Sequence, residues 1–360
     1  MKIPFKIIAC ILFSVFAYPS TAQDWYPLQV DVWDPAFNDS KDRKTVSYVP
    51  LEAASQPWKI CVSIPHLKDA YWLVVNFALI EEAKRLGIRM RINEAGGYSN
   101  LDVQRRQIES CMASGADGLI LSATDATGLN DLIDKYRANG QPVIDLINGV
   151  KTKNITARAA ATYFDNAQLT AKYIKKKSQG TKKTVLWLPG PKGPIWSSEA
   201  DDGFKFELKD SSISIVDTLW GDTGKEVQGN LIRQALSQHK NIDYIVGTSV
   251  SGDAAVGILK KMKLSKKIEI LAYYYDPTVH RHISRGYVVA AAVDQQAIQA
   301  KLAVDMVIRS LEGKLEIKHA GPKILLVDRY NIQGFDSSYS IPPIGFRPVF
   351  SLKDWVRNNE

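Results

Sequence analysis

From residue 58 onwards, short β-type segments alternate with longer segments of helical spacing, and this alternation constrains the fold more than any other feature. The first unit, residues 58–86, shows both patterns: Ile60, Val62 and Ile64 alternate as in a strand, and apolar residues then recur at helical spacing. Gly87 is placed to end the helix. Strands joined through helices run parallel in a sheet that helices cover on both faces.

The alternation runs twice, with a restart after residue 154. The combined series contains too many strands for one sheet of ordinary size, so the sequence predicts an α/β protein with two doubly wound parallel-sheet lobes. We divide the chain into a signal peptide (1–22), an N-terminal strap (23–56), lobe 1 (57–164 and 295–323), lobe 2 (165–294 and 324–345) and a C-terminal tail (346–360).

The first 22 residues have the pattern of a cleavable secretory signal peptide. Lys2 and Lys6 precede an apolar run over residues 7–16, and small residues at Ser20 to Ala22 supply a cleavage site. No later stretch reaches the roughly 18 apolar residues that span a bilayer. We therefore expect a periplasmic protein that does not insert into the membrane.

The formal net charge is +8, but the basic residues are scattered apart from two runs, 175–177 and 260–267. Solvated helix ends explain these runs better than a nucleic-acid-binding stripe does. An exported protein also meets no chromosomal DNA. We expect no nucleic-acid partner.

Two cysteines follow the signal peptide, Cys61 in the first predicted strand and Cys111 in the second predicted helix. In an oxidising compartment they form a disulfide if their Cα atoms lie close enough. The alternative is two buried free thiols, and the sequence leaves both open.

Residues 23–56 alternate aromatic, proline and charged residues without a sustained period. They are therefore predicted to be a strap laid over the surface rather than part of a layer, with Trp25, Trp33 and Tyr48 as its anchors. A partner-binding arm is equally compatible with the pattern.

Five motifs, together with the order of the elements, point to a known family. They are Pro65-His-Leu-Lys-Asp-Ala-Tyr-Trp72, Glu94-Ala-Gly-Gly-Tyr98, Leu188-Pro-Gly-Pro191, Ala272-Tyr-Tyr274 and Gly345-Phe-Arg-Pro-Val349. With them the chain resembles the TorT-type proteins within the type I (ribose-type) periplasmic binding protein family. The resemblance implies two lobes that close by a hinge around a small ligand, with crossings near residues 163–166, 293–295 and 322–324.

The resemblance also implies a function. TorT-type proteins are periplasmic binders of trimethylamine N-oxide that report to the periplasmic domain of a membrane sensor histidine kinase. The alternative with the same fold is the substrate-binding subunit of an ABC importer for a sugar or an amine.

Ligands of open α/β sheets bind at the carboxyl ends of the strands. In lobe 1 this places Asp69 as the helix N-cap, Tyr71 and Trp72 in the first helical turn, and Asn148 after a later strand. The candidates from the hinge and lobe 2 are Tyr163, Trp196, Ser251, Tyr273, Tyr274, Tyr275, Asp276 and Asp294. Tyr274 is preferred among the three tyrosines because it matches the family motif. The set is rich in aromatic residues and contains no arginine.

This composition favours a methylated amine over a sugar. A methylated ammonium has no N–H to donate, so it is held by contacts with methyl groups and by the negative faces of aromatic rings. Asp69 is either a counter-charge, a protonated hydrogen-bond donor, or only a cap. Tyr163, Trp196 and the Tyr275-Asp276 pair depart from the family pattern, which leaves room for another methylated or quaternary amine.

Structural alternatives accompany these assignments. Tyr71 lies on the surface and Trp72 packs in the core if Asp69 only caps the helix, and Trp196 is a surface-loop ring if it merely follows Pro194. No catalytic motif is present: the glycine-rich stretches at Gly190 and Gly221 lack the ending of a phosphate loop. With no metal-ligand or cofactor pattern either, we expect a ligand-binding protein rather than an enzyme.

Overall fold

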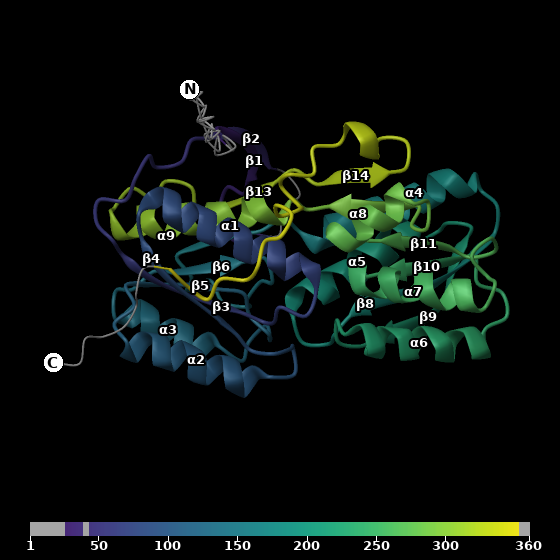
Figure 1. Ribbon diagram of the computed structural model, residues 1–360, viewed down its shortest axis with the longest axis horizontal. Helices are drawn as coiled ribbons and strands as arrows, with labels where there is room; N and C mark the ends of the chain where they lie inside the picture. The colour runs from purple at the N-terminus through teal and green to yellow at the C-terminus, as the bar shows by residue number, and fades with distance from the viewer. Residues whose placement is uncertain (1–25, 39–42, 353–360) are drawn as a thin grey trace, which may run out of the picture.

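The computed structural model describes residues 26–38 and 43–352, and within them the chain forms two α/β lobes that lie side by side (Figure 1). The predicted signal peptide, Trp25 and the end of the C-terminal tail lie outside the described residues. No helix in the described part is long and apolar enough to cross a membrane. The prediction of two doubly wound lobes is confirmed.

Lobe 1 is built on a parallel sheet whose central strands are covered on both faces. These strands are β3 (Lys59–Ile64), β4 (Arg89–Glu94), β5 (Gly118–Leu121), β6 (Val143–Leu146) and β7 (Ala157–Ala159), in the order β4-β3-β5-β6-β7. Ile60, Val62 and Ile120 face α1 (Ala70–Leu86) and α9 (Gln296–Leu311). Leu119 and Val143 face α2 (Leu101–Ala113) and α3 (Asn130–Ala138). This alternation of apolar sides explains why these strands read as continuous apolar runs.

Lobe 2 repeats the arrangement. Its strands are β8 (Lys183–Gly190), β9 (Ile213–Trp220), β10 (Tyr244–Gly247), β11 (Glu269–Ala272), β12 (Ala290–Val293) and β14 (Leu325–Asp328), in the order β14-β12-β11-β10-β8-β9. One face packs against α4 (Tyr163–Ser178) and α5 (Ile195–Leu208), and the other against α6 (Lys225–Gln238), α7 (Ser249–Lys261) and α8 (Pro277–Ser284). A short 3₁₀ turn, η1 (Ile332–Gly334), follows β14.

The chain passes between the two sheets three times. The passages lie between β7 and α4, between β12 and α9, and between β13 (His319–Pro322) and β14. Because β7 pairs with β13 and β12 pairs with β14, the first and third passages start from adjacent strands, and the second and third meet adjacent strands in lobe 2. A hinge built from adjacent strands permits the lobes to rotate as rigid bodies.

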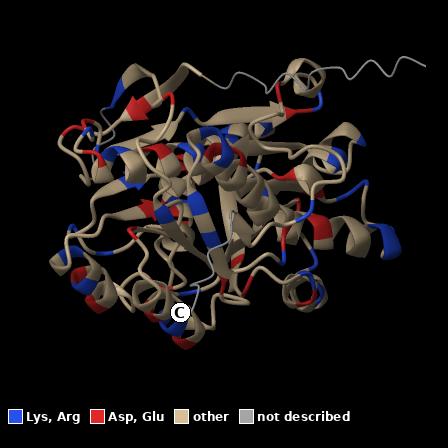
Figure 2. Cartoon of the chain, turned by 60° about the vertical axis from the view of Figure 1, so that its left-hand side comes forward, with Lys and Arg blue, Asp and Glu red and all other residues tan. Residues whose placement is uncertain are grey.

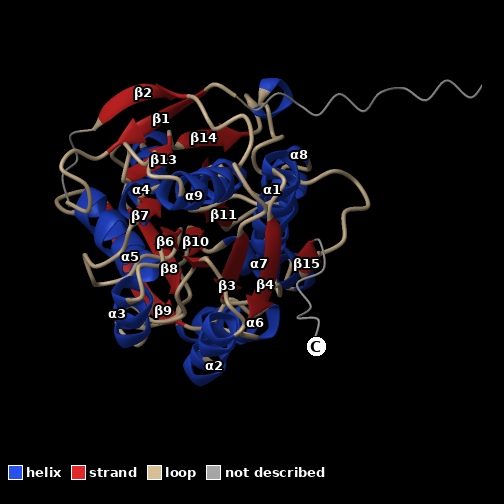
Figure 3. Cartoon of the chain, turned by 90° about the vertical axis from the view of Figure 1, so that its left-hand side faces the viewer, coloured by secondary structure: helices blue, strands red, loops and turns tan. Residues whose placement is uncertain are grey.

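The expectation that residues 23–56 lie outside any layer is wrong for the two strands that they contain. β1 (Leu28–Val32) and β2 (Lys44–Tyr48) form an antiparallel hairpin, and β1 also pairs with β13, so both strands extend the lobe 1 sheet (Figure 3). Leu28 and Val30 are buried and alternate with exposed or half-buried residues. The anchoring roles of Trp33 and Tyr48 are confirmed, since 6% and 4% of their surfaces are exposed.

The C-terminal segment runs from lobe 2 across α1 to the far edge of lobe 1 (yellow in Figure 1). It ends in β15 (Ser351–Leu352), which pairs antiparallel with β4. The Asn76 side chain on α1 exchanges two hydrogen bonds with the Val349 backbone, both of 2.9 Å. This segment therefore contacts both lobes.

Cys61 on β3 and Cys111 on α2 form a disulfide, with their Cα atoms 6.0 Å apart. Lys and Arg side chains are interspersed with Asp and Glu over both lobes in the view of Figure 2. Interspersed positive and negative side chains of this kind are typical of a solvated surface.

Candidate functional site

A small cavity lies between the lobes, at the carboxyl ends of the strands. Nine side chains line it, from Asp69, Tyr71, Trp72, Tyr98, Asn148, Tyr163, Trp196, Thr223 and Tyr274. Six of the nine are aromatic, and lysine and arginine are absent from this lining. We call these nine residues the cage.

The start of α1 supplies three cage residues. Asp69 is the N-cap, and its Oδ1 accepts a hydrogen bond of 3.3 Å from the Trp72 N–H. Tyr71 and Trp72 are 3% and 2% exposed, so Tyr71 is not a surface residue. The Tyr71 hydroxyl donates to the Asp294 carboxylate over 2.5 Å and accepts from the Tyr163 hydroxyl over 3.0 Å. Asp294 thus acts behind the cage and not in its lining.

The crossing and lobe 2 supply the opposite wall. Trp196 lies in the first turn of α5, 3% exposed, and not in a surface loop. A Cβ on Gly190, which has φ +112°, would lie 2.6 Å from the Trp196 ring, so glycine is needed for this approach. Tyr163 is the first residue of α4 and not the end of a strand, because Thr162 caps the helix through the Asp165 N–H.

The three consecutive tyrosines after β11 have separate environments. Tyr274 lines the cage. The Tyr273 hydroxyl donates to the Pro189 carbonyl, and the Tyr275 hydroxyl bonds His280 on α8. Both rings therefore lie outside the cage lining.

Two further candidates also lie outside it. Asp276 caps α8 by accepting from the Thr278 and Val279 N–H groups, and it lines a neighbouring hollow at the cleft mouth together with Asp69. Ser251 bonds within the first turn of α7, to Thr248. The α8 helix itself was not predicted, since within it only Val279 and Ile283 are buried.

Sequence reasoning missed Tyr98 and Thr223 as lining residues. Tyr98 follows β4 and Thr223 follows β9, so the rule that placed the others at strand ends applies to both. It also missed His66, whose Nε2 lies 2.9 Å from the Thr223 hydroxyl across the cleft. His66 packs edge-on against the Trp72 and Tyr98 rings.

Two of the hydrogen-bond donors in the cage are well placed for an anionic or dipolar oxygen. Burial, reinforced by the nearby Asp276 carboxylate, raises the pKa of Asp69 to about 8, so this carboxyl is largely protonated at neutral pH. The buried indole N–H of Trp196 has no hydrogen-bond partner among the described residues. A buried donor without an acceptor costs free energy, which a ligand oxygen would recover.

The rings surround the cavity and are not stacked on one another. The ring centroids of Tyr71 and Tyr274 are 5.3 Å apart, and their ring planes are inclined at 74°. The Trp196 ring centroid lies 5.6 Å from that of Tyr98 and 5.5 Å from that of Tyr163, and in both pairs the planes are tilted. The free space between them is about 10 Å³, which is about the volume that one water needs. A larger ligand therefore enters only when the lobes separate or the rings turn.

Comparisons with known proteins bear on this site. The model of the periplasmic binding protein domain family matches residues 60–315. The periplasmic protein TorT of Escherichia coli (strain K12) is 32% identical over 345 residues, which cover 96% of this chain and 97% of that protein.

Solved structures show the same likeness. A crystal structure of an ABC transporter solute binding protein from Bradyrhizobium sp. BTAi1, with bound bis-tris, is 44% identical, covers 91% of this chain and 98% of that chain, and has a TM-score of 0.78. The TorT chain in a crystal structure of the TorS sensor domain–TorT complex in the presence of TMAO is 29% identical. It covers 81% of this chain and 99% of that chain, with a TM-score of 0.74.

Proposed function

The chain belongs to the TorT-type periplasmic binding proteins, and from this premise we propose that it binds a small methylated amine, trimethylamine N-oxide being the first candidate, between its lobes. The family is one of binding proteins rather than catalysts. The observation that carries the proposal is the cage: six aromatic side chains and a buried Asp69 carboxyl, with no lysine or arginine.

This lining suits an amine oxide. The nitrogen of an amine oxide carries positive charge spread over its methyl groups, which ring faces attract by about 0.5–2 kcal/mol each. Its oxygen accepts hydrogen bonds, and the Asp69 carboxyl, the Trp196 N–H and the Tyr98 and Tyr274 hydroxyls are donors in the lining. A sugar instead needs many planar polar partners around its hydroxyls, and the cage offers few.

We further propose that a membrane sensor histidine kinase reads the closed form through its periplasmic domain. Support comes from the relatives, because TorT has been crystallised with the TorS sensor domain both without ligand and with TMAO. A ligand that binds the closed form better than the open form shifts the population toward it. The kinase then responds to the population of one form.

The second candidate is the binding subunit of an ABC importer. The 44% identical Bradyrhizobium protein is described as such a subunit, and its bound bis-tris is itself an amine. Both candidates place an amine in the cleft, so they differ in the partner and not in the cage. A pull-down with the kinase periplasmic domain, compared with the permease, separates them.

Isothermal titration of the mature protein with trimethylamine N-oxide, trimethylamine, glycine betaine, choline and ribose tests the ligand. We expect saturable binding of the amine oxide, and at least a tenfold loss in Trp72→Leu, because leucine keeps apolar contact but has no ring face. Trp58→Leu makes the same change outside the cage, next to Glu312, and should bind normally. Binding of ribose alone would exclude the aromatic-cage mechanism.

A further inference from the structure

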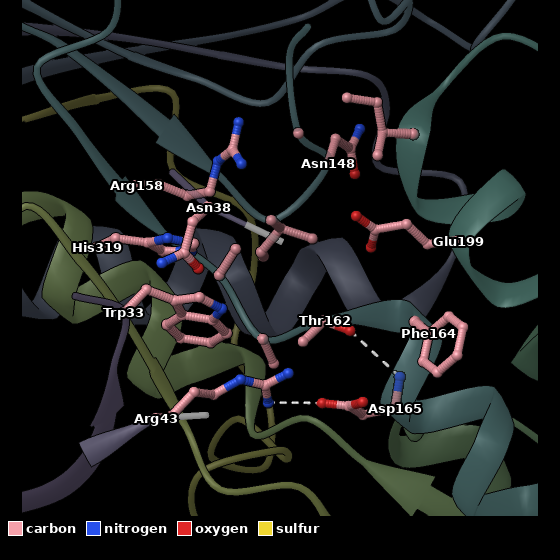
Figure 4. Close-up of a pocket in the computed structure, with 15 residues that line it drawn as sticks. Trp33, Asn38, Arg43, Asn148, Arg158, Thr162, Phe164, Asp165, Glu199 and His319 are labelled. Atoms are coloured by element: carbon pink, nitrogen blue, oxygen red, sulfur yellow. Dashed lines mark hydrogen bonds and ion pairs between the residues drawn. The ribbon is translucent and has the colours of Figure 1, made fainter. Parts of the chain in front are cut away.

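A second, larger cavity of about 340 Å³ shares only Asn148 with the cage (Figure 4). We call it the hinge cavity, because its walls come from both lobes and from the first crossing. Asn148 and Arg158 belong to lobe 1, Thr162 lies on the crossing, and Glu199 projects from α5 of lobe 2. Its volume is within the range of small-molecule sites.

The charges around the hinge cavity are paired except for one. Arg158 bonds the Asp145 carboxylate over 2.6 Å, and Arg43 bonds Asp165 over 2.5 Å. Glu199 has no ion-pair partner among the described residues, and it accepts only a long hydrogen bond, of 3.3 Å, from the Tyr163 N–H. Burial accordingly raises the pKa of Glu199 to about 7.

A second acceptor faces Glu199. The Asn148 amide nitrogen donates to the Ala123 carbonyl over 2.8 Å and to the Tyr98 hydroxyl over 3.3 Å. Ala123 offers only an acceptor, so the amide orientation is fixed and its oxygen is left for the hinge cavity. Figure 4 shows this oxygen and the Glu199 carboxylate on the same side of the cavity, turned toward one another. When Glu199 is ionised both oxygens are acceptors, and an occupant with N–H groups between them would satisfy both.

The other walls specify the rest of an occupant. Part of the lining is apolar, from Ile147, Ala160, Ala161, Phe164 and Ile195. The faces of the Trp33 ring already have partners. The ring stacks on His319 with the two centroids 4.1 Å apart, and the Arg43 guanidinium carbon lies 4.4 Å from the Trp33 centroid. The hinge cavity therefore differs from the cage: it offers carboxylate and amide oxygens, not open ring faces.

We propose that the hinge cavity binds a second small molecule, an organic ammonium ion that keeps at least one N–H and carries a short hydrocarbon body. Its N–H groups donate to the Glu199 carboxylate and the Asn148 amide oxygen, and its hydrocarbon body lies against the apolar wall. A fully methylated ammonium has no N–H and does not satisfy these acceptors.

An occupant of the hinge cavity is coupled to the cage through shared parts. Asn148 bonds Tyr98 of the cage, and Glu199 lies one turn after Trp196 on α5. The occupant also joins groups on opposite lobes, so it favours one hinge angle. It therefore changes the affinity of the cage for its own ligand, and the effect is reciprocal.

The test compares n-butylammonium with its N-trimethylated counterpart, which has the same hydrocarbon body but no N–H. Titration calorimetry of the full mature protein should show saturable binding of butylammonium and at least tenfold weaker binding of the trimethylated ion. Because this comparison uses the unaltered protein, it does not depend on how a variant folds. Absence of butylammonium binding would overturn the proposal, and so would equal affinity for both ions in Trp72→Leu, in which the cage that attracts methylated ammonium ions is impaired.

Variants then locate the site. Glu199→Gln should lower butylammonium affinity at least tenfold, while Glu226→Gln, the same change at an exposed position on α6, should not. Trp72→Leu, which alters the cage, should leave butylammonium binding intact. Loss in Trp72→Leu with retention in Glu199→Gln would place the amine in the cage and contradict the proposal. Amine-oxide binding does not enter these measurements, so failure of the proposed function would be seen separately.

Discussion

Asp69 has two tasks at the first turn of α1, and they use different parts of the same carboxyl group. Its Oδ1 accepts the Trp72 N–H as a helix cap. Burial and the Asp276 carboxylate raise its pKa to about 8, so at neutral pH the group also carries a proton. A capped helix start is thereby combined with a donor that faces the cleft.

The proton on Asp69 predicts how ligand affinity depends on pH. If the protonated carboxyl donates to the amine-oxide oxygen, affinity should be constant below about pH 7 and fall by up to about tenfold per pH unit above pH ~8. Asp69→Asn keeps both a cap oxygen and a donor, so its affinity should not fall there. Calorimetric titrations across this range measure both. Affinity that rises with pH would identify a carboxylate counter-charge instead.

Unfolding experiments provide an independent check on the same proton. The pKa of an unfolded Asp is about 4, so between about pH 4 and 8 the folded protein holds a proton that the unfolded chain has lost. Asp69 therefore lowers the unfolding free energy as pH rises through this window, by at most about 1.4 kcal/mol per unit. In urea denaturation, Asp69→Asn should gain stability relative to wild type as pH rises. A constant difference would show that Asp69 is ionised.

Individual residues of the cage could be predicted where a local sequence pattern gives their position. Asp69, Tyr71 and Trp72 follow from a strand, a cap and a first helical turn. The sequence left two positions for Trp196, in the cleft or in a surface loop, because the start of α5 at Ile195 has no side-chain cap. Tyr98 and Thr223 also follow strands, so the strand-end rule admits them, but which strand-end residues meet in the cleft depends on the approach of the two lobes, which no local pattern encodes.

Among the elements, the pair α4 and α5 positions two cage rings, Tyr163 and Trp196, and its spacing depends on Gly203. A Cβ at Gly203 would lie 2.1 Å from the Phe164 carbonyl oxygen, a backbone atom that cannot move without the helix. The close packing of the two helices therefore requires glycine at this position.

Gly203→Ala should separate α4 from α5 and lower both the melting temperature and the ligand affinity, the stability by about 1–3 kcal/mol. Gly257→Ala is the matched control, because Gly257 lies on α7 with nothing within 4 Å of an added Cβ. That variant should be stabilised by about 0.5–1 kcal/mol. Thermal unfolding and calorimetry of both variants test this. Equal stability of the two would show that the helices adjust their spacing at little cost.

Elements with a sustained period were predictable, and short ones were not. The parallel strands and the helices from α1 to α7 and α9 form the alternation that the sequence predicts, because each buries a periodic apolar face. β1 and β2 are five residues each, so their alternation was too short to detect. β13 and β15 gain their strand character from pairing partners that are distant in sequence.

At the scale of the whole molecule, polar contacts join the two lobes across the cleft. His66 Nε2 hydrogen-bonds the Thr223 hydroxyl, and Lys68 Nζ lies 3.8 Å from Asp222 Oδ2. The Ala126 N–H donates to the Gly193 carbonyl over 3.3 Å. Of these, the His66 bond is buried, with the ring fully covered and Thr223 3% exposed. A buried hydrogen bond between rigid bodies contributes to the closed form alone.

The direction of this bond follows from its neighbours. The Lys68 N–H donates to His66 Nδ1, so Nε2 carries the ring proton and donates to the Thr223 hydroxyl oxygen. Burial lowers the pKa of His66 to about 3, which keeps the ring neutral throughout the physiological range. If the lobes separate, Nε2 becomes accessible and donates to water in place of Thr223.

Thr223→Val should therefore shift the hinge equilibrium toward the open form. Valine has the shape of threonine but no acceptor, so closure would bury an unsatisfied N–H at a cost of about 1–3 kcal/mol. Because about 1.4 kcal/mol is a tenfold change in an equilibrium constant, we expect at least fivefold weaker ligand binding and a larger radius of gyration by solution X-ray scattering. Thr181→Val, at an exposed site in lobe 2, should change neither.

Two further measurements separate closure from direct ligand contact, since Thr223 also lines the cage. The scattering experiment on ligand-free protein detects the hinge shift even when affinity is unknown. A double-mutant cycle with His66→Phe then isolates the pair, because a substitution that has already removed the His66 donor leaves Thr223→Val little to disrupt. Additive effects, or an unchanged radius of gyration in Thr223→Val, would assign Thr223 to the ligand and leave closure to the remaining interlobe contacts.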